Sequence, residues 1–486
     1  MQWSVHGGLR AAVLSLSALL IAPSASLAET STIDTAQLAE FYNQVPVWAK
    51  CQNDSCTRIE VPLDYAHPTG QRISLAVRVI GNRDLPGLLT NPGGPGTGGI
   101  SYAQYLSAVL PPAITSTFSI VGFDPRGTGN SSPIECVTGM FANTWLRTDS
   151  TPDTAREIAT LMSRAQRIAQ GCQNFSPELA RNIGTDATVR DMDILREVLG
   201  NETLNWLGFS YGTSLGSRYA EIFPDRVGRM VLDGAVDPRL NAVQLSRDQS
   251  QGFQTALIRF NKRYPGSIQQ INTLLSKLDH KPLRTNTDYR LVQSEAQNAI
   301  LYSMYSPQLW RALNQALKEA SGGDGTELQR ISYDANDQIT PTKFGSNSLS
   351  AFYAINCWDL PATPQAPRLK SLANRWAEDA VIPELARTLS WSNAPCSEWF
   401  AHSPAPPAPV KTKTTAPIVI IGTTFDPATP LKWAKALHTQ MPTSALVTFN
   451  GDGHTAYLSG SACVDSYVNN YLLTGRTAGN KTCGAN

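Results

Sequence analysis

The segment that most constrains this chain is Gly208-Phe209-Ser210-Tyr211-Gly212, which joins a mostly apolar run to a helix-like run. Residues 204–207 have the pattern of a buried strand, and residues 213–222 have that of a helix. A serine between two glycines in this context takes a sharply turned backbone that lifts its hydroxyl above the sheet. The first amides of the helix then point at the group that the hydroxyl attacks. We therefore predict that Ser210 is a nucleophile; a structural Gly/Ser turn is the alternative.

A serine nucleophile needs a general base, and the sequence offers six histidines. His454 lies in a glycine-rich segment, 450–455, which follows the strand-like run 445–449 near the end of the chain. We predict that His454 is the base. The others lie in a leader, a turn, polar helices and a proline-rich segment, and we interpret them as surface or structural residues: His6, His67, His280, His438 and His402.

The carboxylate that orients the histidine is expected after a strand between the serine and the histidine. Asp426 follows the β-branched run 416–422, at the carboxyl edge where sites form in open α/β sheets. Asp233 is a rival, because it follows another strand-like run, 230–232. We prefer Asp426, since its strand is the last before the strand that leads to His454. A helix cap or a turn is the alternative role for either aspartate.

A glycine-rich loop, 93–99, follows the short strand-like run 88–90. Such glycine density lets backbone amides approach a ligand closely. An oxyanion hole needs one N–H donor from a loop of this kind and one from the residue after the nucleophile. We expect Gly94 and Tyr211 to be these donors. Nucleotide binding is disfavoured, because no Gly-Lys-Ser/Thr follows the loop.

Several motifs together resemble those of the prolyl-aminopeptidase-like serine peptidases in order and spacing. Within that group the chain most resembles the secreted tripeptidyl-aminopeptidase-type hydrolases. One departure is Pro92, where the family frequently has a histidine. The motifs are Gly93-Gly94-Pro95-Gly96, Asp124-Pro125-Arg126-Gly127-Thr128-Gly129 with Ser131, Gly208-Phe209-Ser210-Tyr211-Gly212, Gly422-Thr423-Thr424-Phe425-Asp426-Pro427-Ala428-Thr429-Pro430 and Gly453-His454.

The resemblance implies an α/β-hydrolase fold, an α/β architecture with a mostly parallel sheet, helices on both faces and a large, mainly helical cap insertion. It implies the nucleophile, acid and base roles for Ser210, Asp426 and His454, and the oxyanion roles for Gly94 and Tyr211.

We expect four parts along the chain: a signal peptide over 1–28, a first core segment over 29–240, a cap over 241–410 and a second core segment over 411–486. Helical periodicity dominates the third part. Its end is the proline-rich stretch 403–409, a stiff spacer that returns the chain to the core. An independent domain of another function is the alternative interpretation of this part.

The N-terminus has the features of a signal peptide, with Arg10, an apolar run over 11–21 and small residues up to Ala28. Cleavage after about Ala28 predicts a secreted or periplasmic protein. No apolar stretch is long enough to span a membrane. A pro-segment over 29–42 and the oligomeric state stay open.

The eight cysteines fall in sequence-near pairs, and an even count in an exported chain favours disulfides. The sequence leaves their connectivity open, and eight buried thiols are the alternative. We expect no metal site, because no cysteine pair has histidines nearby. The pairs are Cys51/Cys56, Cys136/Cys172, Cys357/Cys396 and Cys463/Cys483.

A net charge of +1 and a charged fraction of 16% give no basic patch for nucleic acid. We predict an exported serine exopeptidase, without a cofactor, that cleaves peptides near their free N-terminus, as di- or tripeptidyl aminopeptidases do. Such an enzyme must bind an ammonium group; Asp359 is the first expected carboxylate and Glu398 the second, and ordinary surface acids beside a disulfide are the alternative. An exported carboxylesterase and a catalytically silent binding protein are the alternatives.

Overall fold

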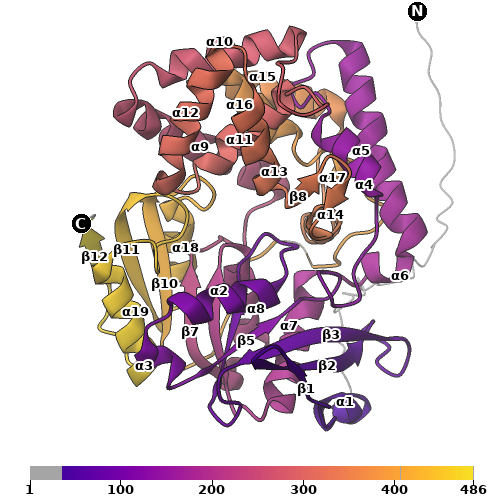
Figure 1. Ribbon diagram of the computed structural model, residues 1–486. Helices are drawn as coiled ribbons and strands as arrows, with labels where there is room; N and C mark the ends of the chain where they lie inside the picture. Colours follow the sequence, from indigo (N-terminus) through magenta and orange to yellow (C-terminus); the bar gives the residue numbers. More distant parts are fainter. Residues whose placement is uncertain (1–34, 406, 485–486) are drawn as a thin grey trace, which may run out of the picture.

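The computed structural model describes residues 35–405 and 407–484, and its centre is a ten-stranded mixed sheet (Figure 1). The strand order is β1-β2-β3-β5-β4-β6-β7-β10-β11-β12, antiparallel from β1 to β5 and parallel from β5 to β12. The expected signal peptide lies outside the described residues. The strands are β1 Ala49–Cys51, β2 Asp54–Pro62, β3 Arg72–Ile80, β4 Gly87–Asn91, β5 Ser119–Phe123, β6 Leu204–Phe209, β7 Val227–Asp233, β10 Ile418–Phe425, β11 Ser444–Asp452 and β12 Lys481–Gly484.

The central strands are buried on both faces, so their sequences read as nearly continuous apolar runs. Successive residues point to opposite faces. Met230 and Leu232 belong to one apolar core, and Val231 between them belongs to the core on the other face. The same alternation along β10 explains why its β-branched run is buried throughout.

Helices cover both faces of the sheet, which confirms the expected α/β-hydrolase fold. One core includes residues of α1, α7, α8 and α18, and the other includes residues of α2, α3 and α19. The bounds are α1 Thr35–Tyr42, α2 Gly99–Val109, α3 Pro112–Thr115, α7 Thr185–Val198, α8 Tyr211–Ile222, the short 3-10 helix η1 Pro224–Arg226, α18 Leu431–Gln440 and α19 Ala462–Thr474.

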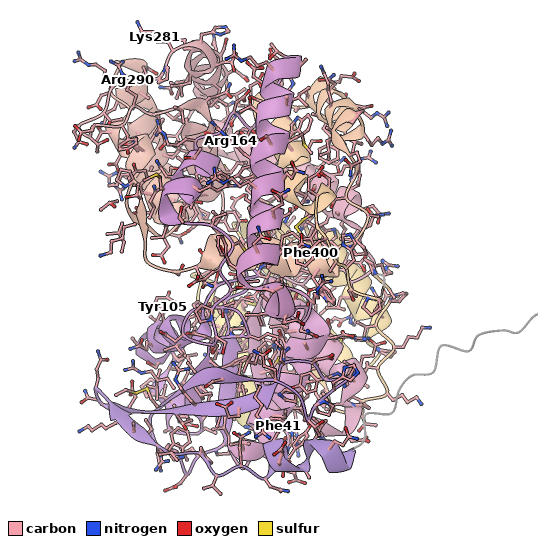
Figure 2. The ribbon with its side chains drawn as sticks, turned by 90° about the vertical axis from the view of Figure 1, so that its right-hand side faces the viewer. Phe41, Tyr105, Arg164, Lys281, Arg290 and Phe400 are labelled. Carbon is pink, nitrogen blue, oxygen red and sulfur yellow. A yellow bond between two sulfur atoms is a disulfide. The ribbon has the colours of Figure 1, made fainter. Side chains whose placement is uncertain are left out.

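A second, mainly helical lobe lies above the carboxyl edge of the parallel strands (Figure 1). Figure 2 shows Lys281 and Arg290 in this lobe, and Phe41 and Tyr105 in the lobe that holds the sheet. The elements of the helical lobe are α9 Ala242–Arg263, α10 Ser267–His280, α11 Gln293–Ser303, η2 Pro307–Leu309, α12 Trp310–Ser321, α13 Thr326–Ala335, β8 Gln338–Thr340, β9 Lys343–Phe344, α14 Ser348–Asp359, α15 Ala366–Glu378, α16 Pro383–Trp391 and α17 Ala394–Ser397.

The helical lobe also takes in an earlier segment, made of α4 Gly139–Leu146, α5 Ala155–Phe175 and α6 Pro177–Ala180. Residues of all three share an apolar core with α14, α15, α16 and α17. In Figure 2, Arg164 marks α5 standing within this lobe. This segment lies within 29–240, the range expected for the first core segment, yet it packs with helices of the third part. Its helical periodicity is local, and only the packing reveals which layer its apolar stripe covers.

Four disulfides join the eight cysteines in the sequence-near pairs: Cys51–Cys56, Cys136–Cys172, Cys357–Cys396 and Cys463–Cys483. Disulfides persist in oxidising compartments, so they indicate a protein that matures outside the reducing cytosol. Among the described residues, no helix has the length and apolar character that a bilayer crossing needs.

The Arg126 guanidinium is fully buried and links three parts of the core near the site. It forms a two-pronged ion pair with Asp191 on α7, at 2.6 and 2.8 Å. It also donates to the backbone carbonyls of Pro62, Leu63 and Asn182. The start of α7 is thereby tied to the end of β2 and to the loop after β5.

We predict that Arg126→Met lowers the free energy of unfolding by about 3–5 kcal/mol, because the fully buried Asp191 loses its guanidinium partner. Arg330→Met is the control, since its pairs with Glu327 and Asp334 are exposed and are worth less than about 1 kcal/mol. Urea unfolding under non-reducing conditions measures both variants. Equal losses in the two variants would contradict the prediction.

Candidate active site

Ser210 sits between β6 and α8 with a φ of 53° and a ψ of −121°. Its backbone N–H donates to the Asp233 carbonyl at 2.8 Å. The two flanking glycines are needed sterically. A Cβ on Gly208 would lie 2.4 Å from the Gly212 carbonyl oxygen, and a Cβ on Gly212 would lie 2.9 Å from the Asn91 carbonyl oxygen. The turn therefore holds Ser210 in a left-handed conformation that an L-residue rarely adopts.

The glycine-rich loop after β4 packs directly against this turn. The Asn91 side chain accepts a hydrogen bond from the Gly93 N–H at 2.9 Å. A Cβ on Gly93 would lie 2.8 Å from Ser210 Cβ and 3.0 Å from the Tyr211 nitrogen, so only glycine allows this approach. Tyr211 opens α8, and Gly94 lines the same cavity as Ser210 and Tyr211. The loop and the helix start thus meet at Ser210.

The imidazole of His454 contacts Asp426, with Nδ1 at 2.9 Å from Oδ1 and 3.0 Å from Oδ2. Asp426 is buried and also accepts hydrogen bonds from the backbone of Ala428, Thr429 and Thr455. These donors hold the carboxylate in place. Because Nδ1 faces Asp426, Nε2 is the nitrogen that can take a proton from a nucleophile.

Burial lowers the pKa of His454, but the negative charges of Asp426 and Asp233 outweigh it and raise the pKa above its ordinary value. The ring lies beside the serine turn: a Cβ on Gly234 would be 3.2 Å from His454 Cε1, and Gly234 follows the residue that holds the Ser210 N–H. Among the described residues, Ser210 Oγ makes no hydrogen bond; catalytic hydrogen bonds commonly tighten only in the complex.

Asp233, the rival for the acid, contacts backbone amides and not the imidazole. Its carboxylate accepts from the Ala456 N–H at 3.0 Å and from the Tyr457 N–H at 2.8 Å. Burial raises its pKa to about 6, against the effect of these hydrogen bonds. Asp426 is therefore the aspartate that touches His454, and Asp233 supports the loop behind it.

Asp359 lies at the end of α14 and lines the cavity that contains Ser210. Its carboxylate accepts from the Thr185 N–H at 3.1 Å and from the Thr185 hydroxyl at 2.7 Å. The Thr185 hydroxyl is also 2.7 Å from the Tyr211 hydroxyl, so Asp359 is linked to the residue after Ser210. Within the described ranges, no basic side chain pairs with Asp359, and burial raises its pKa to about 7.

Glu398, the second expected amine-binding residue, does not reach this cavity. It follows the short helix α17 and is absent from the residues that line the cavity. The Cys357–Cys396 disulfide connects the segments of the two acids but does not bring both to the site. Asp359, the first expected residue, is thus the one that lines the cavity, because the sequence does not show which side chain faces the serine.

Three residues of the site were not predicted from the sequence. The Thr429 hydroxyl lies 3.0 Å from Asp426 Oδ2 and 3.2 Å from His454 Nδ1. Thr185 holds Asp359, and the Tyr305 ring packs edge-on against His454. Thr429 lies in the same sequence motif as Asp426, so the motif could have indicated it. Thr185 and Tyr305 are more than 100 residues from their partners, and no local pattern marks them.

The cavity has a volume of about 410 Å³, and one of its walls follows α8. Ser210, Tyr211, Ser214, Arg218 and Glu221 line it at helical spacing. At 1.5 Å per residue, this wall is about 16 Å long. Among the residues that the structure describes, no group of three or more metal-ligating side chains is gathered. The site is thus an elongated cavity lined by Ser210 and the buried Asp359, with the His454 imidazole beside the serine turn.

Comparisons with known proteins place the chain in a family. Residues 382–483 match the family model described as "TAP-like protein". The chain is 32% identical over 483 residues to "Serine protease Hip1" of Mycobacterium tuberculosis (strain ATCC 25618 / H37Rv), covering 91% of each chain. It is 34% identical over 450 residues to "Carboxylesterase B" of the same organism, covering 86% of this chain and 84% of the relative. It is 29% identical over 468 residues to "Tripeptidyl aminopeptidase" of Streptomyces lividans, covering 90% and 86%.

The resemblance drawn from the motifs is thereby confirmed, although the relatives carry both peptidase and esterase names. Identity above 30% along most of two of these relatives, on a sheet of the order described above, shows that the chain belongs to the TAP-like family of α/β-hydrolases and is a serine hydrolase.

Proposed function

We propose that this hydrolase is an exopeptidase that removes short peptides from the free N-terminus of its substrates. The observation that carries the proposal is Asp359, a buried carboxylate without a basic partner among the described residues, on the wall of the cavity that contains Ser210. A substrate ammonium would complete an ion pair there and relieve the cost of burying the charge.

The cavity wall along α8 supports a peptide as the substrate. An extended chain advances about 3.3 Å per residue, so the wall of about 16 Å matches roughly five residues. A small ester needs no cavity of this length. The name of the Streptomyces relative, "Tripeptidyl aminopeptidase", agrees with the same reaction.

In the proposed reaction, His454 Nε2 takes the Ser210 proton as Oγ attacks the scissile carbonyl carbon. Asp426 holds the Nδ1–H and stabilises the imidazolium. The N–H groups of Gly94 and Tyr211 would donate to the oxyanion, each lowering the barrier by about 3 kcal/mol. His454 then protonates the leaving amine, and water hydrolyses the acyl-enzyme by the reverse path. The four disulfides support action outside the cytosol.

The first test compares the mature protein with Ser210→Ala on a free-amine tripeptide anilide, its N-acetylated form and a short p-nitrophenyl ester. We expect rapid cleavage of the free-amine tripeptide, loss on acetylation and a fall in kcat of about 10⁶ in Ser210→Ala. Turnover of the ester alone would favour a carboxylesterase, which the relative of that name also suggests. No turnover of any substrate would favour a binding protein.

The second test concerns Asp359. We predict that Asp359→Asn raises KM for the free-amine tripeptide about ten- to a hundredfold, because a charge-assisted bond to the ammonium is lost. The ester should be turned over as before. In the parent enzyme, KM for the free-amine substrate should rise as the pH falls below about 7, where Asp359 becomes protonated.

Initial-rate kinetics between pH 5 and 9 measure both effects, and Glu398→Gln is the matched control because Glu398 does not line the cavity. The same rise in KM in both variants, or a parallel loss on the ester, would contradict an amine-binding role for Asp359.

A further inference from the structure

The helical lobe contacts the loop of His454 through Tyr305, which lies between α11 and η2. The His454 N–H donates to the Tyr305 carbonyl at 2.7 Å. The Tyr305 ring meets the imidazole edge-on, with ring centres 5.1 Å apart and an angle of 85° between the planes. A Cβ on Gly453 would lie 3.1 Å from the Tyr305 carbonyl oxygen, so a glycine before the histidine permits this approach. Both the backbone and the ring of His454 thus rest on the helical lobe.

Arg259 of α9 makes a second connection to the same region. Its guanidinium forms an ion pair with Asp452, two residues before His454. It also lies over the Phe425 ring, 3.7 Å from the ring centre, and Phe425 directly precedes Asp426. One cation of the helical lobe therefore contacts both of the segments that carry the acid and the base.

We propose that Tyr305 is a positioning residue for His454, so that the helical lobe builds part of the catalytic machinery in addition to covering the substrate. The proposal rests on the role of His454 as the general base. Asp426 fixes the imidazole from the Nδ1 side, and the Tyr305 ring supports it from the lobe. A displacement of about 1 Å in a catalytic group can cost about a hundredfold in rate.

The support also affects the pH at which the base works. Asp426 faces His454 from the loop after β10, Asp233 faces it from the end of β7, and both raise its pKa against the effect of burial. Tyr305 stays neutral in the working range, because burial raises its pKa to about 12. Removing the Tyr305 ring would admit water to the imidazole. His454 would then be less buried, and its pKa would rise further. The acid limb of the kcat/KM profile would then move to higher pH.

The experiment compares Tyr305→Ala, Tyr305→Phe and Tyr302→Ala in the mature protein with the ester and the tripeptide anilide. In Tyr305→Ala, we expect kcat to fall about ten- to a hundredfold, KM to change less than about twofold and the acid limb to move to higher pH. Tyr305→Phe keeps the ring, so its kcat and its acid limb should match those of the parent. Tyr302→Ala removes a neighbouring ring, 6.4 Å from that of Tyr305, and should leave kcat and the profile unchanged.

Arg259→Met provides a second variant if Tyr305→Ala does not fold, and it should lower kcat with little change in KM. A parent-like kcat and pH profile in Tyr305→Ala would overturn the proposal, as would a loss that Tyr305→Phe does not restore. His454→Ala distinguishes a failure of the proposed function from a failure of the role of Tyr305. If His454→Ala stays active, the proposed function fails; if it is inactive while Tyr305→Ala matches the parent, only the role of Tyr305 fails.

Discussion

The carboxyl end of β7 organises the site, because Asp233 makes two kinds of hydrogen bond there. Its backbone carbonyl holds the Ser210 N–H, and its carboxylate holds the Ala456 and Tyr457 N–H groups. Gly234 follows and leaves room for the imidazole. The serine turn and the histidine loop are thereby attached to one strand end, although Ser210 and His454 are 244 residues apart in the sequence. Burying a carboxylate is costly, and the hydrogen bonds from the Ala456 and Tyr457 amides offset that cost.

Three buried carboxylates lie around the serine turn and the cavity. Asp233, Asp359 and Asp426 are held by backbone amides and hydroxyls rather than by arginine or lysine. Hydrogen bonds of this kind keep a carboxylate in place without cancelling its charge. Asp426 and Asp233 then raise the pKa of His454, and Asp359 has no basic partner among the described residues. By contrast, Asp191 is neutralised by Arg126, as befits a structural pair.

Much of the fold follows from local patterns that a single sequence displays. The β-branched run before Asp426 lies within β10, and the apolar run before Ser210 lies within β6. Both could be predicted because strands buried on both faces have nearly continuous apolar sequences. The helical periodicity expected of the third part is present in α9, which has a stripe of buried apolar residues. The segment 139–180 is helical too, but its placement in the second lobe depends on partners in α14 to α17, far along the chain.

The sequence by itself determined that Ser210 occupies a glycine-flanked turn and that Asp426 and His454 follow core strands, because turn chemistry and strand ends are encoded by neighbouring residues. Only the tertiary structure decided that Asp426, rather than Asp233, touches the imidazole and that Asp359, rather than Glu398, lines the cavity. Only the tertiary structure also brought Thr185 and Tyr305 to the site. These choices depend on which side chains face each other across long separations in sequence, and no local periodicity carries that information.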